Sequence, residues 1–353
     1  MIVVVGTGAA ALGAVWKLSQ QGVPPAEILL LEKSRALGGR LASRWLGKEA
    51  HPTPYSKRFD HGAPYFSLPP ELQACLHAHQ LRHHFKTLPL PVVKLDVQGR
   101  ITDETSTHIT TEELYYCDGG NNAFFKDAFA GYSIRFDFKA SHLREANGTL
   151  WIGDGSEEIA AAKVILTMPA PQAMELLRTL EPTTQLTLPI NSLSEVRYQK
   201  ALVLLCAMSR KTFEAAPVFK DFFAAESANG KCEIALICRE RLKRLPEAFE
   251  DEEPFTVRMS PEFSGQHYDA DESTVIERIR AHLCAAFGID VKLLYANVKK
   301  WRYALCENPQ VVSQSSHILK LAGDYVSNVS GGAAEKAGTV GAAFMSGCRA
   351  AEL

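Results

Sequence analysis

The sequence predicts an α/β protein of two domains, in which a parallel sheet with helices is joined to a domain with a mostly antiparallel sheet. Residues 2–5 form a short apolar run of the kind found in the centre of a parallel sheet, and this run ends at Gly6. Residues 9–21 follow with apolar side chains on one side, which predicts a helix that Gly22 closes. From residue 181 to about 309, alternating strands and one amphipathic helix replace this pattern, as is typical of an antiparallel sheet backed by helices.

The segment from Gly6 to Ala11 has small residues where a dinucleotide-binding turn needs them. Gly6 permits the tight turn, Gly8 lets a pyrophosphate approach the backbone, and Ala11 lets the helix lie close to the strands. The phosphates would lie beside Ala9 and Ala10, on unpaired amides at the positive end of the helix dipole. The alternative is an ordinary tight turn between a strand and a helix.

An acidic residue follows the second apolar run, 28–31. Glu32 would accept hydrogen bonds from ribose hydroxyls, which argues against a phosphate on that ribose. Lys33, Gly39 and Arg40 come next, in a loop suited to pass close beneath the cofactor, with the guanidinium of Arg40 on phosphate or on a ring edge. The alternative is a flexible basic loop with a surface arginine.

Hydrophobic periodicity and turn residues predict the later elements. A helix is expected over residues 71–85, and strands on both sides of the turns at residues 98–99 and 147–148. The expected strands are 92–96, 99–108, 132–143, 149–153, 163–167, 201–207, 232–238, 255–259, 293–298 and 319–322. The other expected helices are 172–180, 273–287 and 338–353.

Several blocks resemble those of one known family. Residues 32–40 resemble the Glu-x-x-x-x-x-Gly-Gly-Arg motif of the flavin-dependent amine oxidase superfamily, and residues 60–66 are similar to a segment of its renalase-like branch. Further similarities lie at residues 167–172, 300–303 and 322–324, in the order of the superfamily. The resemblance implies FAD as cofactor. It also implies a two-domain FAD-binding Rossmann-type fold with a substrate domain, similar to p-hydroxybenzoate hydroxylase and monoamine oxidase.

We expect each domain to be built from separate stretches of the chain. The FAD-binding domain should comprise residues 1–67, 116–180 and 310–353. The substrate domain should comprise residues 68–115 and 181–309, and its sheet is expected to cover the flavin.

The resemblance also implies which residues contact FAD. It places Gly62, Ala63 and Tyr65 against the isoalloxazine and Ala140 against the adenine. It places Asp324 at the ribityl or ribose chain and residues 338–340 at the pyrimidine edge. Pro64 departs from the glutamine usual in the family, which removes a side-chain amide and a backbone donor. The loop at residues 325–337 looks longer than in renalases. The residues expected at FAD are Gly6, Gly8, Ala9, Ala10, Ala11, Glu32, Lys33, Gly39, Arg40, Gly62, Ala63, Tyr65, Ala140, Gly323, Asp324, Gly338, Thr339 and Val340.

The sequence predicts no catalytic acid or base, only candidates for lining the flavin face. Trp301 or Tyr303 would stack on a planar substrate while Arg302 or the preceding lysines, 299 and 300, meet its phosphates. The alternative is an edge strand with a buried tryptophan and solvated cations. Tyr65 and His61 are the other candidates, although a packed or surface histidine is the alternative for His61.

The segment 71–85 contains His77, His79, His83 and His84. His79 and His83 are one turn apart on the expected helix, as two metal ligands would be. Because no acid or cysteine completes a set there, a solvated helix face is expected and no metal site.

Bulk properties exclude several classes of protein. The 353 residues include 38 Lys and Arg against 40 Asp and Glu, a formal charge of −2, so no basic field argues for nucleic acid or an anionic membrane. The eight cysteines include no C-x-x-C pair, as expected for reduced thiols in a cytoplasmic protein. No apolar run approaches the length of a membrane-spanning helix.

The resemblance implies a renalase-like oxidase. Its small-molecule substrates would be 2- and 6-dihydro isomers of NAD(P)H, oxidised to NAD(P)+ by hydride transfer to the flavin while dioxygen is reduced to hydrogen peroxide. Such a hydride donor needs no general base. The alternatives are an amine oxidase, a nicotinamide dehydrogenase and a non-catalytic flavin-binding protein. Oligomeric state is not predicted.

Overall fold

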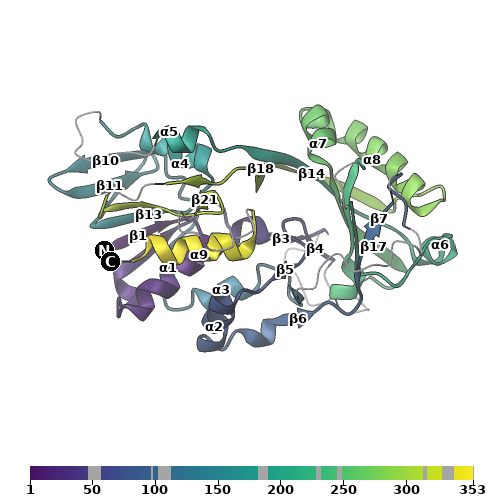
Figure 1. Ribbon diagram of the computed structural model, residues 1–353, viewed down its shortest axis with the longest axis horizontal. Helices are drawn as coiled ribbons and strands as arrows, with labels where there is room; N and C mark the ends of the chain where they lie inside the picture. Colours follow the sequence, from purple (N-terminus) through teal and green to yellow (C-terminus); the bar gives the residue numbers. More distant parts are fainter. Residues whose placement is uncertain are drawn as a thin grey trace.

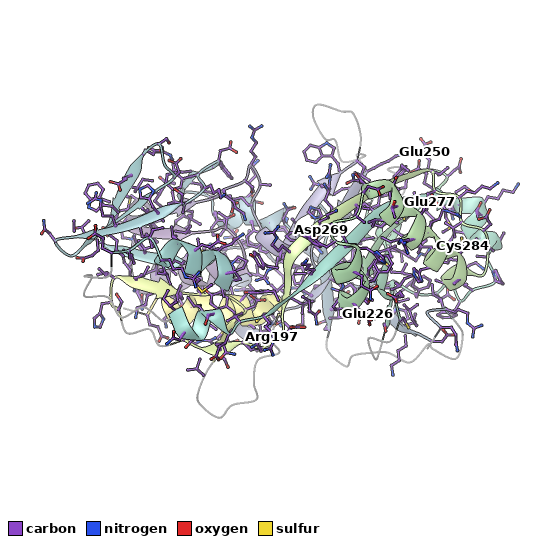
Figure 2. The ribbon with its side chains drawn as sticks, turned by 90° about the horizontal axis from the view of Figure 1, so that it is seen from above. Arg197, Glu226, Glu250, Asp269, Glu277 and Cys284 are labelled. Atoms are coloured by element: carbon purple, nitrogen blue, oxygen red, sulfur yellow. The ribbon has the colours of Figure 1, made fainter. Side chains whose placement is uncertain are left out.

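The computed structural model describes residues 1–46, 57–96, 98–101, 113–181, 190–227, 232–244, 249–312, 316–327 and 338–352. The described chain forms two lobes, joined by the long strands β14 (Tyr198–Ser209) and β18 (Tyr295–Cys306) (Figure 1). These strands pair antiparallel along most of their length. Both chain termini lie in the first lobe. In the view from above, the second lobe carries Glu226, Glu250, Glu277 and Cys284, and Arg197 marks the start of β14 (Figure 2).

The first lobe is built on a parallel sheet with strand order β20-β13-β1-β2-β9. The bounds are β1 Ile2–Val5, β2 Ile28–Leu31, β9 Ser133–Arg135, β13 Lys163–Leu166 and β20 Leu319–Leu321. One face packs against α1 (Ala9–Gln20) and α9 (Val340–Ala350), and Val4 and Leu30 point to that side. Val3 and Leu31 point to the other side. This alternation is what a parallel strand buried on both faces requires.

A smaller antiparallel sheet and two helices cover the second face. The sheet has the order β10-β11-β12, and its apolar residues share a core with Val3 and Leu31 of the parallel sheet. The bounds are β10 His142–Ala146, β11 Thr149–Gly153, β12 Glu158–Ala161, α4 Ala170–Leu177 and α5 Ile190–Ser194. The parallel sheet is therefore covered on both faces, and its strand ends remain the place where polar residues can gather.

The second lobe is built on a six-stranded sheet with the order β18-β14-β17-β16-β15-β7, in which only the β7–β15 pair is parallel. Helices cover one face, where Phe255 and Val257 of the sheet pack with Ile279 and Leu283 of the longest helix. The bounds are β7 Val92–Leu95, β15 Ala224–Ser227, β16 Ile234–Arg239, β17 Glu252–Met259, α6 Arg210–Ala215, α7 Pro261–His267 and α8 Glu272–Phe287. On the opposite face, Ala201 and Val203 of β14 pack with Trp301 of β18 and with Phe59.

Short elements complete the described chain, and β3 and β4 lie between the two lobes (Figure 1). The strands are β3 Ser43–Trp45, β4 Arg58–Asp60, β5 Phe66–Ser67, β6 Phe85–Thr87, β8 Leu114–Cys117, β19 Gln310–Val311 and β21 Val326–Ser327. The helices and 3-10 turns are α2 Pro70–Ala78, α3 Phe124–Ala128, η1 Pro25–Glu27, η2 Gly39–Leu41, η3 Arg82–His84 and η5 Glu240–Lys243. None of the helices among the described residues is long and apolar enough to cross a membrane. All eight cysteines are free thiols.

The predicted fold class is confirmed, and most predicted elements have their observed counterparts within a few residues. Asn147 and Gly148 have φ angles of 51° and 74°, as the predicted tight hairpin turn requires. The single helix over 71–85 is wrong, because Gln80 takes a φ of 55° and separates α2 from η3. The single strand over 132–143 is also wrong, because Asp137 at φ 56° ends β9 well before β10 begins.

Two predictions lie partly outside the described residues. The expected strand 99–108 is described only to Ile101, which forms an isolated bridge with Leu95. The loop at residues 325–337 is described only to Ser327. The five-segment division into domains remains a prediction.

Candidate active site

A cavity of about 1410 Å³ lies between the lobes. On one side its lining follows the ends of β1, β2 and β20, and on the other it includes residues of β14, β17 and β18. Since the carboxyl ends of parallel strands meet at one edge of a sheet, residues far apart in sequence gather there.

The cavity brings together 16 of the 18 residues expected at the cofactor, with Ala11 and Tyr65 as the exceptions. Ala11 is fully buried in α1, as its predicted packing role requires. Tyr65 lies elsewhere: its hydroxyl donates to Glu226 and its ring packs edge-on against Phe223. This placement does not support a contact between Tyr65 and a flavin ring. Of the other candidates, His61, Trp301, Arg302 and Tyr303 all line the cavity.

The turn between β1 and α1 places the N-terminus of α1 at the cavity, with no side chain that caps its free amides. Gly6 has a φ of 110°, and a Cβ there would collide with Oγ1 of Thr167, so this position requires glycine. Gly8 is the N-cap and provides no side-chain cap, and the first turn of α1 contains no acidic residue. The first amides of the helix therefore lack intrahelical partners and favour an anion. A phosphate beside Ala9 and Ala10 stays a prediction.

Glu32 is 7% exposed and lines the cavity beside this turn. Its carboxylate accepts hydrogen bonds from Oγ1 of Thr7 at 2.6 Å and from the amide and hydroxyl of Ser34 at 2.9 and 2.8 Å. These three bonds leave one lone pair on Oε2 for a ligand. The contributions of Thr7 and Ser34 were not predicted, although a threonine inside the glycine turn and a serine two residues after the acid were visible in the sequence.

Arg40 and Asp324 form a fork rather than facing a cofactor separately. The two guanidinium nitrogens of Arg40 donate to the two carboxylate oxygens of Asp324 at 2.7 and 2.6 Å. The hydroxyl of Tyr198 also donates to Asp324, at 3.5 Å. Burial and the neighbouring Asp324 carboxylate raise the pKa of Tyr198, so this phenol stays protonated. The pair fixes a planar cation at the cavity wall.

The backbone at residues 61–63 forms part of the cavity lining. The amide of Gly62 donates to the carbonyl of Ala42 at 3.1 Å, and that of Ala63 to the carbonyl of Arg40 at 2.9 Å. A Cβ at Gly62 would collide with the carbonyl of Arg40. The neighbouring loop therefore requires glycine at this position. The predicted close approach of this backbone to a flat ring stays a prediction.

His61 and Trp301 make one wall of the cavity. The indole Nε1 of Trp301 donates to the carbonyl of His61 at 2.8 Å, and the two rings stack with centroids 5.4 Å apart. Burial, helped by the charge of Arg44, lowers the pKa of His61 to about 4, so the imidazole is neutral near pH 7. Its Nδ1 is buried and has no hydrogen-bond partner among the described residues.

A buried ionic cluster stands behind this wall. Asp60, the residue before His61, accepts from Lys243 at 3.0 Å and from Arg244 at 2.9 Å, and Lys243 also donates to Glu240 at 2.8 Å. Although burial alone would raise it, Arg244 and Lys243 hold the pKa of Asp60 well below its usual range. The cluster joins β4 to η5 of the second lobe. Sequence reasoning missed it because nothing local connects the two segments.

The histidine-rich segment is not the helix face that was expected. His79 packs edge-on against Trp16, with ring centroids 5.5 Å apart. His83 and His84 lie on η3, and His84 meets Asp127 of α3 at 2.9 Å.

Comparison with known proteins identifies the family. Residues 4–78 match the NAD(P)-binding Rossmann-like domain, and residues 100–353 match the family of flavin containing amine oxidoreductases. The chain belongs to the flavin-containing amine oxidoreductase family. No curated protein matches the chain.

Solved structures of the same fold include members with different activities. A protein provisionally assigned as a protoporphyrinogen oxidase, from Exiguobacterium sp. 255-15, has a TM-score of 0.70 at 11% identity, covering 99% of this chain and 97% of that one. Cyclohexylamine oxidase from Brevibacterium oxydans IH-35A has a TM-score of 0.69 at 11% identity with the same coverage. Putrescine oxidase bound to putrescine has a TM-score of 0.66 at 10% identity, again covering 99% and 97%. At these identities the likeness shows the fold alone.

The cavity fits the flavin that the family name implies. An anion-binding helix N-terminus, a buried carboxylate at Glu32 and the guanidinium of Arg40 follow one another along its wall. The N-terminus of α9 enters the cavity at Thr339 and Val340. There the hydroxyl of Thr339 already caps the amide of Ala342 at 3.1 Å, which leaves the amides before it as donors for a ligand.

Proposed function

We propose that the protein is an FAD-dependent oxidase that acts on an anionic dinucleotide. The proposed substrates are the 2- and 6-dihydro isomers of NAD(P)H, as in renalases. The bound flavin would supply the two-electron chemistry, by which the dihydronicotinamide, dioxygen and a proton give NAD(P)+ and hydrogen peroxide. The physiological role would be repair of damaged nicotinamide cofactors.

The charge of the cavity lining carries this proposal. Among the described lining residues there are eight cations and three carboxylates, in a chain whose formal charge is −2. The cations are Lys33, Arg40, Arg44, Lys139, Lys200, Arg258, Lys299 and Arg302, and the carboxylates are Glu32, Glu175 and Asp324. The two phosphates of FAD would balance only part of this excess.

Most of the excess positive charge lies on the second-lobe side of the cavity. Lys200, Arg258, Lys299 and Arg302 come from β14, β17 and β18, and none of the three lining carboxylates does. Among the described residues, no carboxylate lies within ion-pair distance of Arg44, Arg258, Lys299 or Arg302. Such a surface favours a substrate that brings its own phosphates.

The residues of the site would bind and orient the substrate without moving protons from it. Hydride transfer from a dihydronicotinamide needs no general base, and the neutral His61 is the one titratable group in the aromatic wall. Trp301 and Tyr303 are two residues apart on β18, so their side chains share one face of the strand. Both line the cavity, where they offer flat surfaces to a nicotinamide ring. The lobes would exclude bulk water from the ring between them.

An amine oxidase is the second candidate, and the same aromatic residues favour it. Trp301 and Tyr303 could flank a small uncharged amine as well as a nicotinamide. The family name and the amine-oxidising structures of the same fold agree with this candidate. The lining cations argue against it, because an amine in its ammonium form would be repelled from the second lobe.

Anaerobic mixing of the purified, FAD-loaded protein with each donor tests the proposal. We expect a 2- or 6-dihydro isomer of NAD(P)H to bleach the yellow flavin band. Admitting air should restore the band, with one hydrogen peroxide formed for each NAD(P)+. Bleaching by cyclohexylamine or putrescine, without bleaching by either isomer, would establish the second candidate instead. A band that none of these donors bleaches would contradict both.

A further inference from the structure

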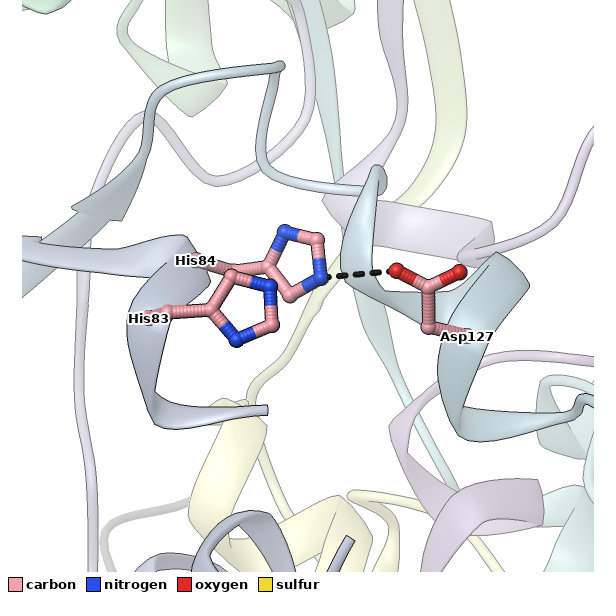
Figure 3. Close-up of side chains that lie close together, drawn as sticks. All are labelled: His83, His84 and Asp127. Carbon is pink, nitrogen blue, oxygen red and sulfur yellow. Dashed lines mark hydrogen bonds and ion pairs between the residues drawn. The ribbon is translucent and has the colours of Figure 1, made fainter. Parts of the chain in front are cut away.

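Three metal-ligating side chains meet at the surface of the first lobe, away from the cavity. His83 and His84 come from η3 and Asp127 from α3, and one ligand atom of each lies within 4.8 Å of the others. Figure 3 shows the two rings side by side, with His84 directed at the carboxylate. None of the three residues lines the cavity. We propose that they form a binding site for a divalent transition-metal cation of the Zn2+ class.

The geometry of His83 prepares one ring nitrogen for a metal. Its Nδ1 lies 2.8 Å from the carbonyl oxygen of Gln80. A carbonyl can only accept, so Nδ1 carries the hydrogen, and Nε2 of the neutral ring keeps a free lone pair. Metal-binding histidines are commonly oriented in this way by a backbone carbonyl behind the ring. The left-handed turn at Gln80 brings that carbonyl into position.

His84 and Asp127 supply the other two ligands. Nε2 of His84 and Oδ2 of Asp127 are 2.9 Å apart. Ligands bound tetrahedrally to zinc at about 2.0–2.1 Å lie about 3.3 Å from each other, so this pair is already close to the required separation. The cation would take the place of the proton between them. In a neutral His84 ring the proton would move to Nδ1, and in a protonated ring, which already carries one on Nδ1, it would pass to solvent.

The ligand set selects the class of metal. Two imidazoles and one carboxylate suit zinc, copper or nickel, whereas calcium and magnesium prefer sites made of oxygen ligands. The ring centroids of His83 and His84 are 4.2 Å apart, so the Nε2 of His83 is near enough to be brought in by a side-chain rotation. His83 and Asp127 are exposed, which gives the cation a path from solvent and room for water at a fourth position.

The site would connect two segments that are distant in the chain. Asp127 is 43 residues from His84, and the two belong to α3 and η3 respectively. A cation held by both segments binds the folded protein and not the unfolded chain, so it should raise stability by mass action. The sequence alone does not predict this site, because the acid that completes it, Asp127, lies outside the histidine-rich segment.

Zinc titration of the FAD-loaded protein, freed of metal with a chelator, tests the site. By calorimetry we expect one equivalent of Zn2+ to bind, with a dissociation constant in the micromolar range. His83→Gln and Asp127→Asn should each weaken binding at least tenfold. His77→Gln is the matched control, since His77 is an exposed histidine of the neighbouring α2, and it should bind like the parent. Equal zinc affinity in His83→Gln, Asp127→Asn and His77→Gln would overturn the proposal.

Copper provides a second readout that does not depend on affinity. Oxidised flavin has no unpaired electron, so the electron paramagnetic resonance of one added equivalent of Cu2+ reports the metal alone. We expect hyperfine splitting from two imidazole nitrogens in the parent and from one in His83→Gln. Zn2+ should also raise the melting temperature of the parent and of His77→Gln, but not of Asp127→Asn. A copper spectrum that is the same in the parent and in His83→Gln would contradict the site even if zinc binds elsewhere.

Discussion

Arg40 and Asp324 are 284 residues apart in the chain, yet they face each other as a fork at 2.6 and 2.7 Å on the wall of the cavity. Asp324 is nearly buried, whereas the side chain of Arg40 keeps 31% of its surface exposed toward the cavity. The carboxylate therefore holds a guanidinium whose remaining donors can bind an anion. This relationship makes the placement of Arg40 dependent on the last part of the chain.

Replacing Arg40 by glutamine should weaken FAD binding at least tenfold, because a planar cation beside the phosphates is lost. It should also lower the free energy of unfolding by about 1–3 kcal/mol, since Asp324 would remain buried without its partner. FAD fluorescence titration and urea unfolding measure the two effects. Arg35→Gln is the control, because its pair with Asp137 is exposed and worth little. If the Arg40 and Arg35 variants bind FAD alike, Arg40 has no role at the phosphates.

Replacing Glu32 by alanine should weaken FAD binding by about 1–3 kcal/mol, the usual loss for a charged hydrogen-bond acceptor. Thr7→Val should have a smaller effect, since it removes only one of the three donors that orient the carboxylate. The flavin retained after dialysis and the dissociation constant measure the change. Glu27→Ala, an exposed acid just before β2, is the matched control. Full flavin occupancy in the Glu32 variant would remove this residue from the ribose site.

His61 should make stability depend on pH below neutrality. Its pKa is lowered to about 4 by burial and by Arg44, whereas a histidine of the unfolded chain titrates near 6.5. Between these values the unfolded chain binds a proton that the folded protein does not. The stabilisation from the neutral ring is therefore fully present above about pH 6.5 and is lost as pH falls toward 4.

Urea unfolding of the FAD-loaded protein at pH 6.5 and at pH 4.5 measures this dependence. From pH 6.5 to pH 4.5 the free energy of unfolding of the parent should fall by about 1–3 kcal/mol more than that of His61→Gln, allowing for the partial exposure of the ring. His77→Gln should follow the parent, because His77 is exposed on α2. Parallel pH curves for the parent and the His61 variant would show that the ring titrates normally in the folded state.

Local patterns in the sequence were enough to predict the first strand, the glycine turn, the helix and the acid. Val3, Gly6 and Glu32 act within one β-α-β unit, where a short stretch of chain decides the conformation. The gathering of Asp324 at the same edge was also predictable, since parallel strands share the direction of their ends. The resemblance to a known family added the order of the later segments.

The contacts between distant segments could not be predicted in this way. The hydrogen bond from Trp301 to His61 spans 240 residues, and the ion pair of Lys243 with Asp60 spans 183. Each depends on how the lobes pack, and no local period encodes that packing. Tyr65 is another example: its hydroxyl donates to Glu226 of the second lobe, a contact across 161 residues that no local pattern indicates.

The cations of the second lobe would face the phosphates of the proposed substrate. Arg302 is exposed on the edge strand β18, lines the cavity and forms no ion pair with a described carboxylate. Arg302→Ala should raise KM for a dihydronicotinamide dinucleotide about three- to tenfold with little change in kcat, as expected when substrate and transition state lose the same phosphate contact. Raising the ionic strength should shrink the difference in KM between variant and parent, because an exposed charge is screened.

Arg278→Ala, on the exposed face of α8 and outside the cavity lining, is the matched control. If the two variants have the same KM, Arg302 is a solvated edge-strand cation. If kcat falls instead while KM holds, the residue acts on the reacting ring and not on the phosphates.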